Sequence, residues 1–133
     1  MANEALCRVR LGPAFDVTVA DGTGIEKGTV LKISAGDRVG AKSSADNDLF
    51  LGITLAEKIA SDGRTHVPVT RHGIFDMTDS GAGITLGDVV MIKGANLVAT
   101  LDEAGVTSMG QTVGIALEDI GASAVGQILV GGW

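Results

Sequence analysis

Short runs of alternating apolar and polar residues make up much of the chain, and glycine-rich turns separate them. Two of these runs place aliphatic residues at every second position: Leu51, Ile53 and Leu55, and Val113, Ile115 and Leu117. Side chains alternate between the two faces of a β-strand, so this spacing predicts that each triplet lies on one face of a strand. Residues 46–60 also fit a short helix, but Gly114 and Gly121 in the counterpart 111–122 disfavour one.

An internal repeat organises the sequence. The pattern of residues 22–33 recurs 59 residues later at 81–92, and residues 52–55 recur 62 residues later at 114–117. Two further pairs match at a slightly larger offset: Gly63 with Gly126, and Val67 with Val130. We therefore predict two units, 21–70 and 80–131, after a segment 1–20 that has no copy.

The predicted fold class is all-β, a compact small β-barrel or sandwich built from the two repeated units, with an extended N-terminal arm. The chain of 133 residues is expected to form a single domain, 1–133. Pro68 lacks an N–H, so the strand at 65–70 is predicted to lie at a sheet edge. A helical turn is expected at most at residues 43–48.

The composition points to association with a partner. Hydrophobic residues make up 45% of the chain, which also has 20 glycines but only three Phe, one Trp and no Tyr. The mean hydropathy is +0.34. One small core does not bury this much apolar surface, so the surplus indicates an oligomer or a docked subunit.

The charge distribution narrows the classes of partner. The net charge is −6, and all of it lies in residues 72–133, where Lys93 is the only basic residue. Such a chain repels phosphate backbones, which disfavours nucleic acid as a partner. Cys7 is the only cysteine, and the sequence shows neither a signal peptide nor an apolar run of membrane-spanning length. We expect synthesis in a cytoplasm and no membrane partner.

The glycine loops resemble a nucleotide-binding motif only superficially. The spacing Gly-x-Gly-x-x-x-Gly has one residue too many for a dinucleotide site, and no strand-helix-strand context follows it. The motif also occurs in both units. We therefore interpret its glycines as structural turns, namely Gly24, Gly28, Gly83 and Gly87.

The remaining polar residues predict no catalytic, cofactor or metal site. His66 and His72 are the only histidines, and without a third histidine or a second cysteine they make a poor metal pair. Asp46 and Asp48 lack the glycine and distal glutamate of a calcium loop. A small hydrolase or isomerase remains an alternative that rests only on the two histidines.

The N-terminal residues 1–12 have no copy in the repeat and mix aliphatic with basic side chains. Two interpretations stay open: a tail or ordinary first strand, and an arm that adds as a strand to a partner's sheet. On the second interpretation, removal of 1–12 leaves the fold largely intact but abolishes attachment to the partner. The candidate contact residues are Asn3, Leu6, Arg8, Arg10 and Leu11.

The duplicated Gly-Ile-x-x-Gly-x-Val-x-x-Ile segment, with Gly-Ile-x-Leu after each copy, resembles the capsid cement (head decoration) proteins of tailed bacteriophages. The resemblance covers about residues 20–131. It implies a non-enzymatic homotrimer that binds the major capsid protein on the outer surface of the expanded head and stabilises it. It also implies a role in capsid contact for the N-terminal arm. The alternative is a virion fibre, tail or host-attachment module.

Overall fold

The computed structural model describes residues 3–36, 38–101 and 109–131. In these residues the regular elements are short strands and one 3-10 helix, η1 (Met109–Gln111). The strands are β1 (Leu6–Arg10), β2 (Phe15–Thr18), β3 (Val30–Ile33), β4 (Gly40–Lys42), β5 (Phe50–Thr54), β6 (His66–Thr70), β7 (Gly73–Asp79), β8 (Val89–Ile92), β9 (Leu97–Thr100), β10 (Thr112–Ala116) and β11 (Val125–Val130). The all-β prediction is confirmed. The predicted helical turn at 43–48 is wrong, because the Asp48 carboxylate accepts the N–H groups of Ser44 and Ala45 in a non-helical turn.

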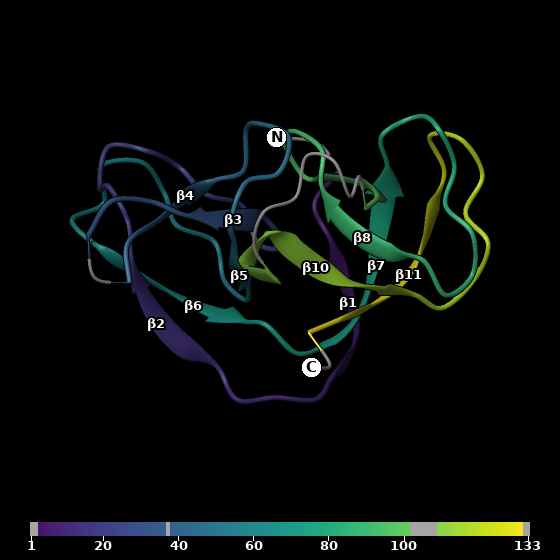
Figure 1. The fold of residues 1–133 in the computed structure, drawn as a ribbon. Helices are drawn as coiled ribbons and strands as arrows, with labels where there is room; N and C mark the ends of the chain where they lie inside the picture. Colours follow the sequence, from purple (N-terminus) through teal and green to yellow (C-terminus); the bar gives the residue numbers. More distant parts are fainter. Residues whose placement is uncertain (1–2, 37, 102–108, 132–133) are drawn as a thin grey trace.

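Two sheets form the molecule (Figure 1), and equivalent strands of the two sequence units follow one another in the same order in each sheet. The first sheet has the order β2-β6-β5-β3-β4, and the second has β7-β11-β10-β8-β9 with β1 added beside β7. Sequential neighbours are antiparallel in both sheets. A parallel pairing of β7 with β9 closes the second sheet into a five-stranded barrel. The first sheet approaches closure through a parallel bridge between Thr18 and Val39.

Each sheet encloses an apolar core, and the second core extends across both sheets. The first cluster fills the interior of the first sheet with residues such as Val17, Leu31 and Val69. The second cluster fills the second barrel and also contains Phe50 and Ile53 from the outer side of the first sheet. Full burial of a side chain such as Phe50 contributes about 1.5–3 kcal/mol. The two sheets are therefore packed directly against each other.

A β-bulge overturns the prediction that Leu51, Ile53 and Leu55 share one face. The β3–β5 register shifts between Leu31 and Lys32, which changes the alternation on the facing strand. As a result, Leu51 packs in the first core while Ile53 packs in the second. The copy in β10 has an equivalent shift after Thr112.

The second triplet is divided in the same way. Val113 is fully buried, Ile115 is half-buried and Leu117 is exposed. The three side chains therefore do not share one buried face, contrary to the prediction.

The predicted edge position of the Pro68 strand is also wrong, because β6 lies between β2 and β5. The carbonyl of Pro68 accepts the N–H of Leu55, so the polar groups of Pro68 face β5. Strand β5 ends at Thr54, and the pairing of β5 with β6 covers only Thr70 and Val69. The missing N–H thus falls where the β5 ladder has ended, which is how an interior strand accommodates proline.

The strand registers relate the two sheets in more detail than the sequence pattern did. Val17 pairs with Val67 in the first sheet, and Met77 pairs with Gly126 in the second. Val67 therefore corresponds to Gly126 and not to Val130. The same register gives the sequence Phe-Asp-Val-Thr of β2 the place in the first sheet that Phe-Asp-Met-Thr at 75–78 of β7 has in the second. This correspondence supports a repeat that begins at Phe15, earlier than residue 21.

Candidate functional site

Strand β1 lies at the end of the second sheet and has one open edge. It pairs only with β7 in the described part of the chain, through contacts that include Leu6 with Asp76 and Arg10 with Gly73. An edge strand presents unpaired N–H and C=O groups that a strand of another protein can bind. Of the two interpretations of the N-terminus, the structure thus places residues 6–10 as a first strand of the chain's own sheet.

The side chains of this strand make an apolar surface with two cations. The exposed fractions of Leu6, Val9 and Leu11 are 58%, 44% and 51%. Both Nε and Nη2 of Arg8 lie 2.8 Å from Oδ2 of Asp76, which ties β1 to β7 through an ion pair. Arg10 donates from Nε to the carbonyl of Gly12.

Of the five predicted contact residues, Leu6, Arg8 and Arg10 lie on β1. Leu11 directly follows the strand, and Asn3 is exposed three residues before it. We call the exposed side chains of Leu6, Arg8, Val9, Arg10 and Leu11 the β1 surface.

Ala5 fixes the start of this segment between the two sheets. Its N–H donates to the carbonyl of Gly28 over 2.7 Å, and its side chain is buried in the second core. A Cβ on Gly28 would lie 2.3 Å from the Ala5 carbonyl oxygen, so only glycine fits there. The role of Ala5 was not anticipated from the sequence, because nothing in its immediate neighbours distinguishes it from a tail residue.

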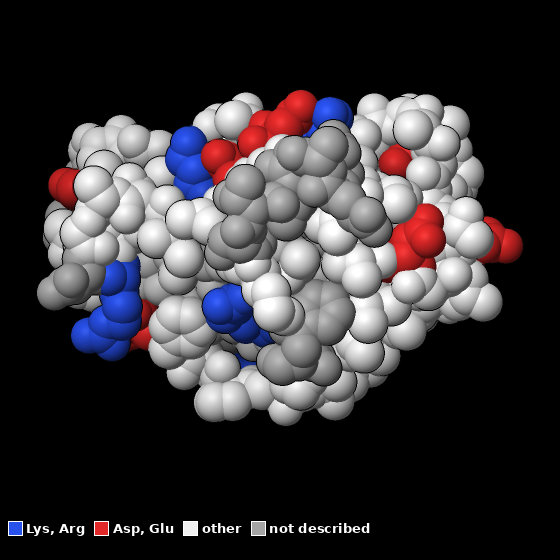
Figure 2. All heavy atoms as spheres, viewed as in Figure 1, with Lys and Arg blue, Asp and Glu red and all other residues white. Residues whose placement is uncertain are grey.

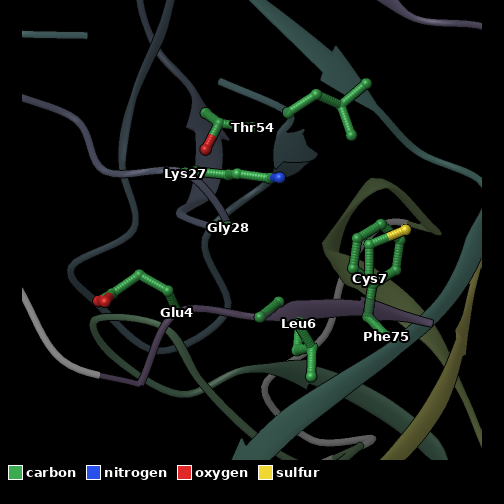
Figure 3. Close-up of a pocket in the computed structure, with 9 residues that line it drawn as sticks. Glu4, Leu6, Cys7, Lys27, Gly28, Thr54 and Phe75 are labelled. Carbon is green, nitrogen blue, oxygen red and sulfur yellow. The ribbon is translucent and has the colours of Figure 1, made fainter. Parts of the chain in front are cut away.

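A cavity of about 330 Å³ lies beside β1, at the junction of the two sheets. Phe75 and Leu55 form part of the apolar wall of the cavity, and Glu4 and Lys27 are the charged residues that line it. In Figure 3 the Lys27 ammonium points toward the side formed by Cys7, whereas the Glu4 carboxylate points away. Burial and a hydrogen bond with Glu26 raise the pKa of Glu4. The cavity is open, and its mixture of groups suits the side chain of a docked protein segment better than a cofactor.

The glycine loops contain turns and no helix. Gly28, Gly83 and Gly87 have φ values of 85°, 83° and 87°, which favour glycine, whereas Gly24 has no positive φ. A phosphate site of this type needs a helix N-terminus, and in the described residues the only helical element is the single turn at 109–111.

A buried ammonium forms the most extensive polar cluster of the first sheet. Nζ of Lys58 donates to the carboxylates of Asp21 (3.0 Å) and Asp62 (3.2 Å), and to the carbonyls of Asp21 and Ile59. Burial lowers the pKa of Lys58, but these hydrogen bonds outweigh it and raise the pKa above 10.5. The N–H of Arg64 and its guanidinium, together with Lys58, lower the pKa of Asp62.

The sequence analysis missed this cluster, although the repeat holds a signal for it. Lys58 occupies the position of Ile120, as the matching bridges of Lys58 with Ile25 and of Ile120 with Ile84 show. Where one unit of the repeat has a buried aliphatic residue and the other has a lysine, the buried ammonium needs carboxylates or other acceptors close by. All acceptors of Lys58 are internal, so this cluster is a structural feature and not a ligand site.

The acidic half of the sequence maps onto the second barrel. At the right-hand end of Figure 2, where this barrel lies, acidic side chains are visible without basic ones. Several of these acids also order loops: Asp119 accepts the N–H of Leu86, and Glu118 accepts that of Gln127.

The described residues contain no group of three His, Cys, Asp or Glu side chains that could hold a metal ion. His66 is exposed and contacts the hydroxyls of Thr18 and Thr65, and His72 is exposed at the turn before β7. Asp46 forms an ion pair with Lys93 instead of a calcium loop. No helix in this part of the chain is long and apolar enough to cross a membrane.

Comparisons with known proteins give one family and one similar fold. The sequence profile of the family described as "Phage cement protein" matches residues 9–132. The fold is similar to that of the head fiber gp8.5 N base in bacteriophage phi29, with a TM-score of 0.55 and 15% sequence identity. That match covers 89% of this chain and 92% of the other. Among curated proteins, none matches the chain.

Proposed function

The chain belongs to the phage cement protein family, and we propose that it decorates the phage head by binding the outer surface of the expanded major capsid lattice. Its role is structural: it stabilises the head as a component of the virion. We further propose that it acts without catalysis, that it is synthesised in the host cytoplasm, and that it binds as a homotrimer.

The open edge of β1 is the observation that carries this proposal. A capsid strand that pairs with this edge would form main-chain hydrogen bonds, which supply affinity, while the β1 surface supplies side-chain contacts. Leu6, Val9 and Leu11 are aliphatic and exposed on this edge. Burial of one such side chain contributes about 1.5–3 kcal/mol, so a few of them offset the cost of ordering a short segment.

Stabilisation of the head follows from mass action. A subunit that binds the expanded lattice but not its precursor or the dissociated capsid proteins lowers the free energy of the expanded state. Three binding surfaces in one trimer raise the effective concentration at neighbouring sites, so the complex is tighter than any single contact.

The test is decoration of expanded heads that lack this protein, measured by co-sedimentation and by cryo-electron microscopy. Leu6→Lys is the informative variant, because lysine opposite Asp76 preserves the fold while it places a charge in the apolar contact. We expect binding to weaken at least about tenfold. Val125→Lys, at a position 61% exposed on β11, is the matched control and should bind normally. Heads that show no outer density with the unmodified protein would contradict the proposal.

A fibre base is the second candidate function. The similar structure from bacteriophage phi29 is the base of a head fiber, and the shared fold is the observation that supports this second candidate. The same images separate the two, because a fibre base would carry additional density that extends away from the head.

A further inference from the structure

The repeat places the same strand edge in both sheets, and only one copy is covered. Residues 75–78 of β7 have the sequence Phe-Asp-Met-Thr, and β1 lies beside residues 73–76 of this strand, with Arg8 on the carboxylate of Asp76. Residues 15–18 of β2 (Phe-Asp-Val-Thr) have the matching register against β6, so Asp16 holds the place of Asp76. No described strand lies along β2 where β1 lies along β7.

Backbone geometry shows which way Asp16 faces. Because the polar groups of Pro68 point to β5, those of Val67 and Val69 point to β2. Their partners on β2 point back toward β6, and the alternate residues Asp16 and Thr18 point away from it. The N–H of Thr18 confirms this direction, since it donates across the gap to the carbonyl of Arg38.

The edge at Asp16 is open. Within the described residues, no backbone or side-chain group forms a hydrogen bond with Asp16. Pro13, Ala14 and Asp16 correspond to residues of β7 that β1 covers, and all three are exposed. The backbone groups and the carboxylate therefore face solvent together.

We propose that this edge, residues 13–16, is a second strand-addition site, and that it takes an extended segment of the major capsid protein with an arginine opposite Asp16. The site rests on the proposed capsid-binding function and adds to it. The arginine follows from the covered copy, in which the guanidinium of Arg8 lies 2.8 Å from the carboxylate of Asp76. Two strand sites on one subunit would join two capsid segments.

A second copy of this chain is the less favourable occupant. Its only segment known to complement this motif is β1, and β1 is anchored by the burial of Ala5 and by the Ala5–Gly28 hydrogen bond. Transfer of β1 to a neighbour would expose Ala5 and the β7 edge.

The first experiment asks whether the edge accepts a strand at all. The probe is a synthetic peptide with the sequence of residues 5–11 and serine in place of Cys7, added to the ¹⁵N-labelled protein. We expect shifts of the amide signals of Ala14, Phe15 and Asp16, and about fivefold weaker binding of a peptide with glutamate in place of Arg8. The absence of shifts at millimolar peptide would overturn the proposal, as would shifts confined to β7, which would mean exchange with β1.

The second experiment uses decoration of expanded heads by Asp16→Pro and Asp16→Arg. Proline at 16 removes only an outward N–H, so the fold should persist, and circular dichroism checks it. We expect both variants to bind at least about fivefold more weakly, whereas Glu57→Arg, which reverses an exposed charge elsewhere, should bind normally. Normal binding by both Asp16 variants contradicts the second site alone, while failure of the unmodified protein to bind contradicts the proposed function itself.

Discussion

Lys58 and its two carboxylate partners make the stability of the protein depend on pH at both extremes. The pKa of Asp62 lies below its ordinary value of 3.8, so its contribution is present above that pH and is lost as pH falls toward the lowered pKa. The pKa of Lys58 lies above 10.5, so its contribution is complete below pH 10.5 and is lost as pH rises through the raised value.

We therefore expect Tm to be level from about pH 5 to pH 9 and to fall on both sides. Lys58→Ala should lower the plateau, because it removes the cation that Asp21 and Asp62 share and leaves Arg64 beside Asp62 alone, and it should weaken the alkaline fall. Lys27→Ala, which removes an exposed lysine, is the control. Thermal denaturation from pH 2 to pH 11.5 measures both effects. An unchanged alkaline fall in Lys58→Ala would show that another group controls it.

Two glycines with the same backbone conformation separate conformational strain from steric overlap. Gly28 and Gly87 have φ values of 85° and 87°. A Cβ added at Gly28 would overlap Ala5, whereas a Cβ added at Gly87 would have no other part of the structure within 4 Å apart from its adjacent residues. Gly87→Ala should cost about 1–2 kcal/mol from strain alone. Gly28→Ala should cost about 1–3 kcal/mol more. Urea denaturation measures both, and equal costs would mean that Ala5 does not pack on this turn.

At the scale of elements, strand β1 is both part of the core and a binding edge. The expectation that residues 1–12 can be removed with little effect on the fold does not allow for Ala5, which is buried in the second core. We expect deletion of residues 1–12 to lower Tm substantially and to expose the β7 edge. Deletion of residues 1–3 alone, the control, should leave Tm nearly unchanged. Hydrogen exchange should locate the added mobility of the longer deletion in β7, and protection equal to that of the full chain would contradict this.

At the scale of the whole molecule, the second core joins the two sheets. Phe50 belongs to the first sheet but is fully buried in the second core, with the guanidinium of Arg71 5.4 Å from its ring centre. We propose that the chain is one domain for this reason, and we expect a single unfolding transition. Phe50→Ala should cost about 3–5 kcal/mol and lower that transition as a unit. Calorimetry that resolves two transitions, with only one of them shifted, would show that the sheets unfold independently.

The sequence by itself determined the class of the fold and the recurrence within it. Alternating aliphatic residues and regularly spaced glycine turns are local signals, and they indicated strands in the right places at β5, β6 and β10. The Phe-Asp-x-Thr repeat at 15–18 and 75–78 was also present in the sequence, and only its shortness hid it. The placement of the candidate binding residues at the N-terminus, in the segment that has no copy, stays a prediction.

Only the tertiary structure decided which edges are covered and which charges are buried. Strand order and register depend on pairing between residues far apart in sequence, so Pro68 in an interior strand and the bulge that divides Leu51 from Ile53 were not visible in the local pattern. The burial of Lys58 required the loop after β2 and the loop after β5 to meet. For the same reason, Asp76 is covered by β1 while Asp16, in an almost identical segment, faces solvent: one chain has a single N-terminal strand to place on two equivalent edges.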